Sequence, residues 1–141
     1  MRPFIFAIAA AWLCWSSDVS AQDKGTAEQH GKASVYSDRL QGKKTASGAR
    51  MDQSAMTAAS RKLPLGAKAK VTNLKTGKTA DVKINDGGPV PKERVIDVSK
   101  KAADQLGIKK EEGLAPVKVE AKPADQPTPQ LREKVEQAAR H

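Results

Sequence analysis

The chain carries an aspartate, Asp86, where an alternating segment runs into a sharp turn. Ala80, Val82 and Ile84 recur at every second position, which is typical of a β-strand with one buried face. Residues 85–89 read Asn-Asp-Gly-Gly-Pro, in which Gly and Asn tolerate positive φ and Pro cannot continue a hydrogen-bonded ladder. A carboxylate at such a strand mouth, beside glycines that let a ligand approach, can act as a catalytic acid. The local pattern alone favours a plainer role, in which the aspartate bonds its own backbone in an Asx turn.

Few other side chains in the sequence could act as catalytic groups or metal ligands. Asp52 and Asp97 are further carboxylates, for which hydrogen bonding in a turn or at a strand end is the more ordinary role. His30 and His141 are the only histidines, too few for a metal cluster. We therefore expect neither a bound metal nor a cofactor.

The first 21 residues have the pattern of a secretory signal. Arg2 precedes a short apolar run within residues 4–15, and a small-x-small site ends at Ala21. The run is too short to span a bilayer permanently. A lipid anchor at Cys14 is disfavoured because the bulky Leu13 precedes it. We predict export, with cleavage after Ala21, to the periplasm, the cell envelope or the medium, and no stable membrane insertion afterwards.

Composition narrows what the exported chain can bind. The only cysteine, Cys14, leaves with the signal, so disulfides are excluded. Tyr36 is the only aromatic residue that remains, so the core must be aliphatic and stacking platforms are nearly absent. The formal charge stays at +9, because the signal holds one basic and one acidic residue. An exported chain meets few polynucleotides and many anionic envelope polymers, so nucleic acid is not the expected partner.

Short strands must position Asp86. Strands are predicted at residues 31–36, 56–58, 67–73, 79–84, 95–98 and 117–121, with a hairpin formed by 67–73 and 79–84. Ser99 caps a helix over residues 100–106, which Gly107 ends. Such a set favours a small closed barrel, because closure removes unpaired strand edges.

The chain accordingly divides into four parts. They are a signal (1–21), a disordered leader (22–30), a barrel domain (31–121) and a Pro-rich tail (122–141). The tail ends in a weak amphipathic helix with Leu131, Val135 and Ala138 on one side, which we expect to be frayed or disordered. Loss of the tail should then barely change stability.

Seven short segments follow one another in a set order along residues 31–121. They are Gly31–Tyr36, Lys44–Gly48, Met56–Gly66, Val71–Leu74, Lys83–Asp86, Arg94–Ser99 and Ala102–Gly107. As an ordered set they resemble the RlpA-like (rare lipoprotein A) family. The resemblance implies an all-β fold of small α content, a six-stranded double-psi β-barrel with one short helix, also found in expansins. It further implies an enzyme of the septal-ring lytic transglycosylase type, which cuts peptidoglycan glycan strands lacking stem peptides and leaves an anhydro-muramic end.

The resemblance also assigns roles to residues. Asp86 matches the family's catalytic aspartate. One acid/base can suffice in this reaction, because the sugar's own hydroxyl attacks its anomeric carbon, whereas hydrolases commonly need two carboxylates. Ser60 and Ala49 stand where active members usually carry histidine and glutamate, and serine is no base at neutral pH. Substrate contacts are expected from Tyr36, Thr45, Ser47, Arg50, Arg61 and Asn85.

Three functions remain open at this point. The main prediction is a lytic transglycosylase that uses Asp86. The second is a non-catalytic, expansin-like glycan-binding module, which the replacements at Ala49 and Ser60 favour and the scarcity of aromatics disfavours. The third is a secreted structural or effector protein. Basic residues either keep the protein soluble or attract the lactyl carboxylates of stemless strands; they are Lys43, Lys44, Arg50, Arg61, Lys62 and Lys68.

Overall fold

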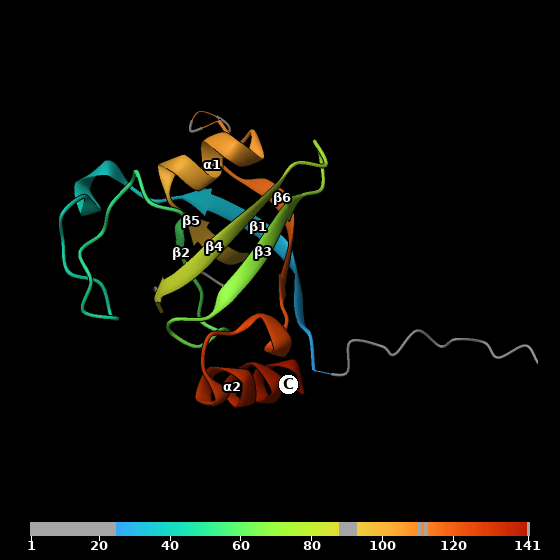
Figure 1. Ribbon diagram of the computed structural model, residues 1–141. Coiled ribbons are helices and arrows are strands. Elements are labelled where there is room, and N and C mark those ends of the chain that lie inside the picture. The colour runs from blue at the N-terminus through green and yellow to red at the C-terminus, as the bar shows by residue number, and fades with distance from the viewer. Residues whose placement is uncertain (1–24, 88–92, 110, 112, 141) are drawn as a thin grey trace, which may run out of the picture.

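The computed structural model describes residues 25–87, 93–109, 111 and 113–140 (Figure 1). The predicted signal and its cleavage site lie outside these residues, as does Pro89 of the turn that follows Asp86. Six strands of the described chain close into a barrel in the order β1-β5-β2-β4-β3-β6. Their bounds are β1 Ala27–Val35, β2 Thr57–Ala59, β3 Lys68–Asn73, β4 Thr79–Asp86, β5 Arg94–Val98 and β6 Ala115–Ala121. The predicted six-stranded closed barrel is therefore confirmed.

The barrel mixes parallel and antiparallel pairs. β1 pairs with β5, and β2 with β4, in parallel, whereas the other neighbours run antiparallel. The β3–β4 hairpin runs in register from Lys68 opposite Lys83 to Thr72 opposite Thr79. The parallel β2–β4 pair matters most for function, because it brings the residues that follow β2 to the carboxyl end of β4.

Small aliphatic side chains fill the barrel, as the composition predicts. Ile84, Ile96, Val71, Val98 and Val117 are fully buried. The described aromatic residue, Tyr36, stands apart from this core in a small buried cluster with Met51 and Ala59. An aliphatic interior thus holds the strands, and the one aromatic ring lies near the chain segments that follow β1 and β2.

Helix α1, Lys100–Leu106, covers one end of the barrel (Figure 1). Ser99 caps it, since its hydroxyl oxygen accepts from the Ala102 N–H, and Gly107 ends it in the left-handed region at φ 72°. Ala102, Ala103 and Leu106 form its buried face. Both predicted helix signals are therefore confirmed.

The predicted leader and tail differ from the structure. β1 begins at Ala27, so residues 27–30, expected to be disordered, pair with β6. The tail contains a 3₁₀ turn, η3 (Pro123–Asp125), and a helix, α2 (Pro129–Ala139), at the opposite end of the barrel from α1 in Figure 1. The expectation of a frayed tail is wrong, because Val135 on α2 is completely buried and joins the barrel core.

One side chain fastens the tail to the barrel. The side-chain oxygen Oε1 of Gln126 accepts from the Lys68 backbone N–H at 2.7 Å. The side-chain Nε2 of Gln126 donates to the Lys68 backbone carbonyl at 2.9 Å and to the Lys122 backbone carbonyl at 3.0 Å. The amide thereby pairs with the backbone at the start of β3 as a neighbouring strand would. We call Gln126, Val135 and the elements η3 and α2 the tail clamp.

Candidate functional site

Two segments attach to the backbone at the end of β4. The carbonyl of Asp86 accepts from the Ser60 N–H at 3.0 Å, because Ala59 pairs with Asp86 in the β2–β4 ladder. The carbonyl of Asn85 accepts from the Ser47 N–H at 3.1 Å. The loop that precedes β2 and the turn that follows it are thus both tied to the half-buried Asp86 end of β4.

The phenol of Tyr36 lies within electrostatic reach of two carboxylates. Its backbone N–H donates to the Val98 carbonyl at 2.9 Å, which holds it beside β5. Burial, then the negative charges of Asp86 and Asp97, raise the pKa of Tyr36, so the phenol stays neutral. Its oxygen is buried and has no hydrogen-bond partner among the described residues. Tyr36 therefore offers a neutral O–H group close to Asp86.

Asp97 and Asp52 have the structural roles that the sequence favours for them. Asp97 accepts a hydrogen bond from the Ser34 hydroxyl, and its Oδ1 lies 3.5 Å from the Arg94 Nε. Asp52 is exposed and accepts from the Ser54 hydroxyl at 2.6 Å and the Ser54 N–H at 2.9 Å, which lower the pKa of Asp52. Of the three carboxylate residues, Asp86 is the one at the strand end to which the two segments attach, whereas Asp52 is the one that lines the cavity beside Asn85.

A cavity of about 580 Å³ opens beside Asn85. Ser47, Ala49 and Arg50 line one part of it, and Thr57 and Leu65 line another. The oxygens Asn85 Oδ1 and Thr57 Oγ1 are buried and have no hydrogen-bond partner in the described part of the chain. Because buried polar atoms nearly always find partners, two unpartnered oxygens on residues that line one cavity single out this end of β4.

Thr57 is the residue of this cavity that sequence reasoning missed. It opens a strand whose next residues, Ala58 and Ala59, are buried, so the local pattern reads as core. Its place in the site follows from the ladder, in which Thr57 pairs with Lys83, two positions before Asn85. That register is a tertiary fact that no local pattern in the sequence carries.

Ser60 and Ala49 lie close to the site without supplying the family's side-chain chemistry. Ser60 is 1% exposed, and its hydroxyl oxygen accepts from the Leu63 N–H at 3.2 Å, so it closes a turn. Ala49 is exposed and lines the cavity, and its carbonyl accepts from the Thr45 hydroxyl at 2.7 Å. The hydroxyls of Thr45 and Ser47 are 2.9 Å apart, so Thr45 supports the loop that shapes the cavity.

The structure brings three of the six predicted contact residues to the cavity. Tyr36, Thr45 and the candidate acid Asp86 are not among the residues that line it. Ser47, Arg50 and Asn85 line the cavity, whereas Arg61 lines a different hollow together with Lys62 and Arg94. Within the described residues, no group of three or more His, Cys, Asp or Glu side chains is arranged to hold a metal ion. In the same part of the chain, we find no helix with the length and apolar character needed to span a membrane.

Comparison with known proteins agrees with this arrangement. Residues 28–119 match the family model described as "Lytic transglycolase". The endolytic peptidoglycan transglycosylase RlpA of Neisseria meningitidis is 48% identical over 92 residues, which cover 65% of this chain and 38% of that protein. A probable endolytic peptidoglycan transglycosylase RlpA of Nostoc sp. is 41% identical over 105 residues, covering 74% and 27%. The chain thus spans less than half the length of these curated relatives.

Two solved structures share the barrel. The Streptomyces papain inhibitor superposes with a TM-score of 0.51 at 22% identity, over 66% of this chain and 93% of that one. The Clavibacter michiganensis expansin does so with a TM-score of 0.50 at 24% identity, over 67% and 50%. These likenesses concern the fold, whereas the family match spans 28–119 and includes the Asp86 strand. The chain belongs to the RlpA-like family of lytic transglycolases, whose fold is the double-psi β-barrel.

Proposed function

We propose that the chain is an endolytic peptidoglycan transglycosylase, exported to the cell envelope, that acts on glycan strands lacking stem peptides. The observation that supports the proposal is the end of β4, where two loop segments attach to the backbone of Asn85 and Asp86, Asn85 borders a cavity, and the neutral phenol of Tyr36 lies within electrostatic reach of Asp86. The names of the curated relatives support the substrate class. Peptidoglycan lies outside the cytoplasm, so the predicted signal at residues 1–21 is part of the same proposal.

Asp86 acts in this reaction first as an acid and then as a base. Its carboxyl group donates a proton to the glycosidic oxygen, the bond from that oxygen to the anomeric carbon breaks, and the leaving sugar keeps the proton as a hydroxyl. A hydroxyl of the remaining sugar attacks its own anomeric carbon and closes the anhydro ring. Its proton passes to the Asp86 carboxylate, which restores the acid. No water is consumed, so a second carboxylate is not required.

The groups around Asp86 suit an N-acetylated sugar. Asn85 Oδ1 can accept from an acetamido N–H, and the Thr57 hydroxyl can donate to an acetamido carbonyl. The Tyr36 O–H can donate to a further sugar oxygen while its raised pKa keeps it neutral. Hydrogen bonds thus take over the recognition that aromatic stacking provides in many sugar sites, which fits a chain with one described aromatic residue.

One observation favours a second candidate function, a glycan-binding module without catalysis. The Ser60 hydroxyl is occupied by the Leu63 N–H, and Ala49 offers no carboxylate to the cavity. The two positions at which family members usually carry histidine and glutamate therefore contribute no acid or base. A binding module needs the cavity and its unpartnered oxygens only.

Asp86→Asn is the experiment that separates these functions. We expect the release of anhydro-muramic ends from stemless strands to fall by at least about 100-fold, the lower range of general acid–base contributions. Stability should change by about 1 kcal/mol or less, because Asn keeps the shape and an acceptor oxygen. Asp52→Asn is tested beside it, because Asp52 bonds the turn at Ser54 and also lines the cavity. Asp104→Asn is the matched control, since Asp104 is exposed on α1 and does not line the cavity.

Each result selects one function. Equal activity in the wild type and in Asp86→Asn rules out the catalytic assignment, and loss in Asp52→Asn alone moves the acid to that residue. A wild type that binds stemless strands without releasing ends supports the binding module. In that case, Ala49→Glu combined with Ser60→His tests whether the family's side chains restore turnover.

A further inference from the structure

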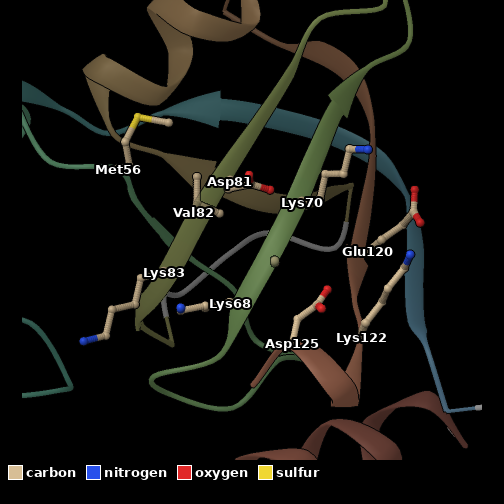
Figure 2. A pocket seen from close by; sticks show the side chains of 10 residues that line it. Met56, Lys68, Lys70, Asp81, Val82, Lys83, Glu120, Lys122 and Asp125 are labelled. Carbon is tan, nitrogen blue, oxygen red and sulfur yellow. The ribbon is translucent and has the colours of Figure 1, made fainter. Parts of the chain in front are cut away.

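A second hollow, of about 710 Å³, lies on the outside of the barrel. Lys68 and Lys70 of β3, Lys83 of β4, and Lys122 and Asp125 at the start of the tail are among the residues that line it, and Figure 2 labels them. We call this hollow the lysine groove. Lys122 and Asp125 lie beyond residues 28–119, so one wall comes from outside the segment that the family model matches.

Like charges meet directly at one end of the lysine groove. Lys68 and Lys83 are opposite each other in the β3–β4 register, and both are exposed. Such a pair is unfavourable across two strands, where opposite charges are the stabilising arrangement. Neither lysine forms an ion pair with any described residue.

Two of the three acidic residues of the groove lie toward its other end, whereas Asp125 precedes Gln126, which bonds the backbone of Lys68. Glu120 is paired with Lys118 at 2.9 Å, and Asp81 stands opposite Lys70 in the β3–β4 register. Their negative charges therefore have cationic neighbours of their own. Lys68 and Lys83 form no ion pair with a described residue, Asp125 included, so the positive charge available to a ligand is concentrated at this pair.

The groove continues from the candidate site. Lys83 lines both the lysine groove and the cavity beside Asn85, so the two hollows share one wall residue. An enzyme that cuts within a strand must hold sugars on either side of the bond that breaks. A strand leaving the cavity past Lys83 meets Lys68 next, directly across the hairpin.

We infer that the lysine groove is a second binding region for the stemless glycan strand, in which Lys68 and Lys83 bind carboxylates that the strand carries. The inference rests on the proposed function, because it takes the glycan strand as the ligand. The lysine ammonium groups complement carboxylates, and the net charge of +9 draws an anionic polymer toward the surface. The pair Lys68 and Lys83, unfavourable in the unbound protein, becomes favourable when a carboxylate lies between the two ammonium groups.

The test measures binding in the absence of cleavage. The ligands are purified stemless glycan strands, which carry lactyl carboxylates, and neutral oligomers of N-acetylglucosamine. Lys68→Gln with Lys83→Gln is introduced into the Asp86→Asn chain. The matched control, Lys75→Gln with Lys109→Gln, removes the same charge from two exposed lysines that do not line the groove.

We expect the groove variant to bind stemless strands about fivefold to tenfold more weakly at low salt, as two exposed charge contacts allow. The difference should shrink at high ionic strength, which screens exposed charges. Neutral oligomers should bind both variants alike, and the control should stay within about twofold of its parent. The thermal midpoint of the groove variant should hold or rise, because a like-charge pair is removed.

Four outcomes overturn the inference. An equal loss in the control shows general charge attraction, an equal loss for neutral oligomers shows that carboxylates are not what is recognised, and unchanged binding shows that the strand takes another path. Nucleic acid bound with the same dependence on Lys68 and Lys83 refutes the commitment to a glycan. Release of anhydro ends by the wild type is scored separately, so the proposed function can stand when the groove fails.

Discussion

Gln126 and Asn85 are both buried amides, 2% and 6% exposed, yet their bonding differs. The side chain of Gln126 makes three hydrogen bonds to backbone groups of Lys68 and Lys122, whereas the side-chain oxygen Oδ1 of Asn85 has no partner among the described residues. A satisfied amide holds two parts of a chain together, and an unsatisfied one costs stability unless a ligand completes it. The comparison thus separates a region built for stability from one built for binding.

The neighbours of each amide follow the same division. Around Asn85, Thr57 Oγ1 and the Tyr36 hydroxyl also lack partners in the described chain. Around Gln126, the tail clamp is complete, because Thr128 caps α2 by accepting from the Leu131 N–H at 3.2 Å and Val135 is fully buried. The two regions also touch. Leu131 packs close to Gly66, which lines the cavity, so the clamp supports one wall of the site.

Truncation after Ala121 should have the largest effect on stability. It exposes the core that Val135 covers and leaves the Lys68 N–H and carbonyl without Gln126, for a loss of about 2–4 kcal/mol. In a domain of this size the thermal midpoint should fall by about 10 °C or more. Thermal unfolding of the full and truncated chains measures it, with truncation after Ala139 as the control. A fall in the thermal midpoint of a few degrees or less would mean that the tail contributes little to stability, as its sequence suggests.

The comparison of the two amides predicts opposite results for the same substitution. Gln126→Ala should cost about 2–3 kcal/mol, because it leaves backbone groups of Lys68 unpaired, and should change the affinity for neutral N-acetylglucosamine oligomers, which do not depend on Lys68, by less than about twofold. Asn85→Ala should cost about 1 kcal/mol or less and weaken that affinity by about tenfold, the loss expected for one good hydrogen bond to a ligand. Chemical denaturation and binding titrations provide the two measurements. Equal stability losses with equal affinity losses would remove the distinction between clamp and site.

Much of the barrel could be predicted because its signals are local. The alternation in β3 and β4, the Ser99 cap and the Gly107 stop act within a few residues, and the structure contains each of them. The tail clamp could not be predicted in this way. Its stability depends on one amide and one valine that meet partners about 60 residues or more distant in sequence, as Gln126 meets Lys68.

The candidate site divides similarly. Asp86 could be located from its turn and from the family resemblance, and Ser47, Arg50 and Asn85 do gather at one cavity. Arg61 could not be placed, because the direction of a side chain after β2 depends on how the turn at Ser60 folds. Thr57 was missed for the converse reason, since only the β2–β4 register brings it two positions from Asn85 along the ladder.

The smallest expected effect concerns an ion pair on β6, the strand that precedes the tail clamp. The Lys118 ammonium lies 2.9 Å from Glu120, just before the tail, and its hydrogen bond lowers the pKa of Glu120. A carboxyl whose pKa is lower in the folded state stabilises the fold above its unfolded pKa of 4.5, and this contribution disappears as pH falls through the folded value. The pair is partly exposed, so Glu120→Gln should cost about 0.5 kcal/mol or less at neutral pH.

The pH dependence then distinguishes the ion pair from the amide. The Glu120→Gln difference should be full above the unfolded pKa of 4.5 and should shrink as pH falls through the lower folded pKa of Glu120. The Gln126→Ala loss should be the same at about pH 7 and about pH 4, because an amide and a backbone do not titrate there. Thermal unfolding of the three chains at these pH values measures both. A Gln126→Ala loss that shrinks in acid would mean that titrating groups help hold the tail, and a Glu120→Gln difference that persists in acid would mean that Glu120 acts by packing rather than by charge.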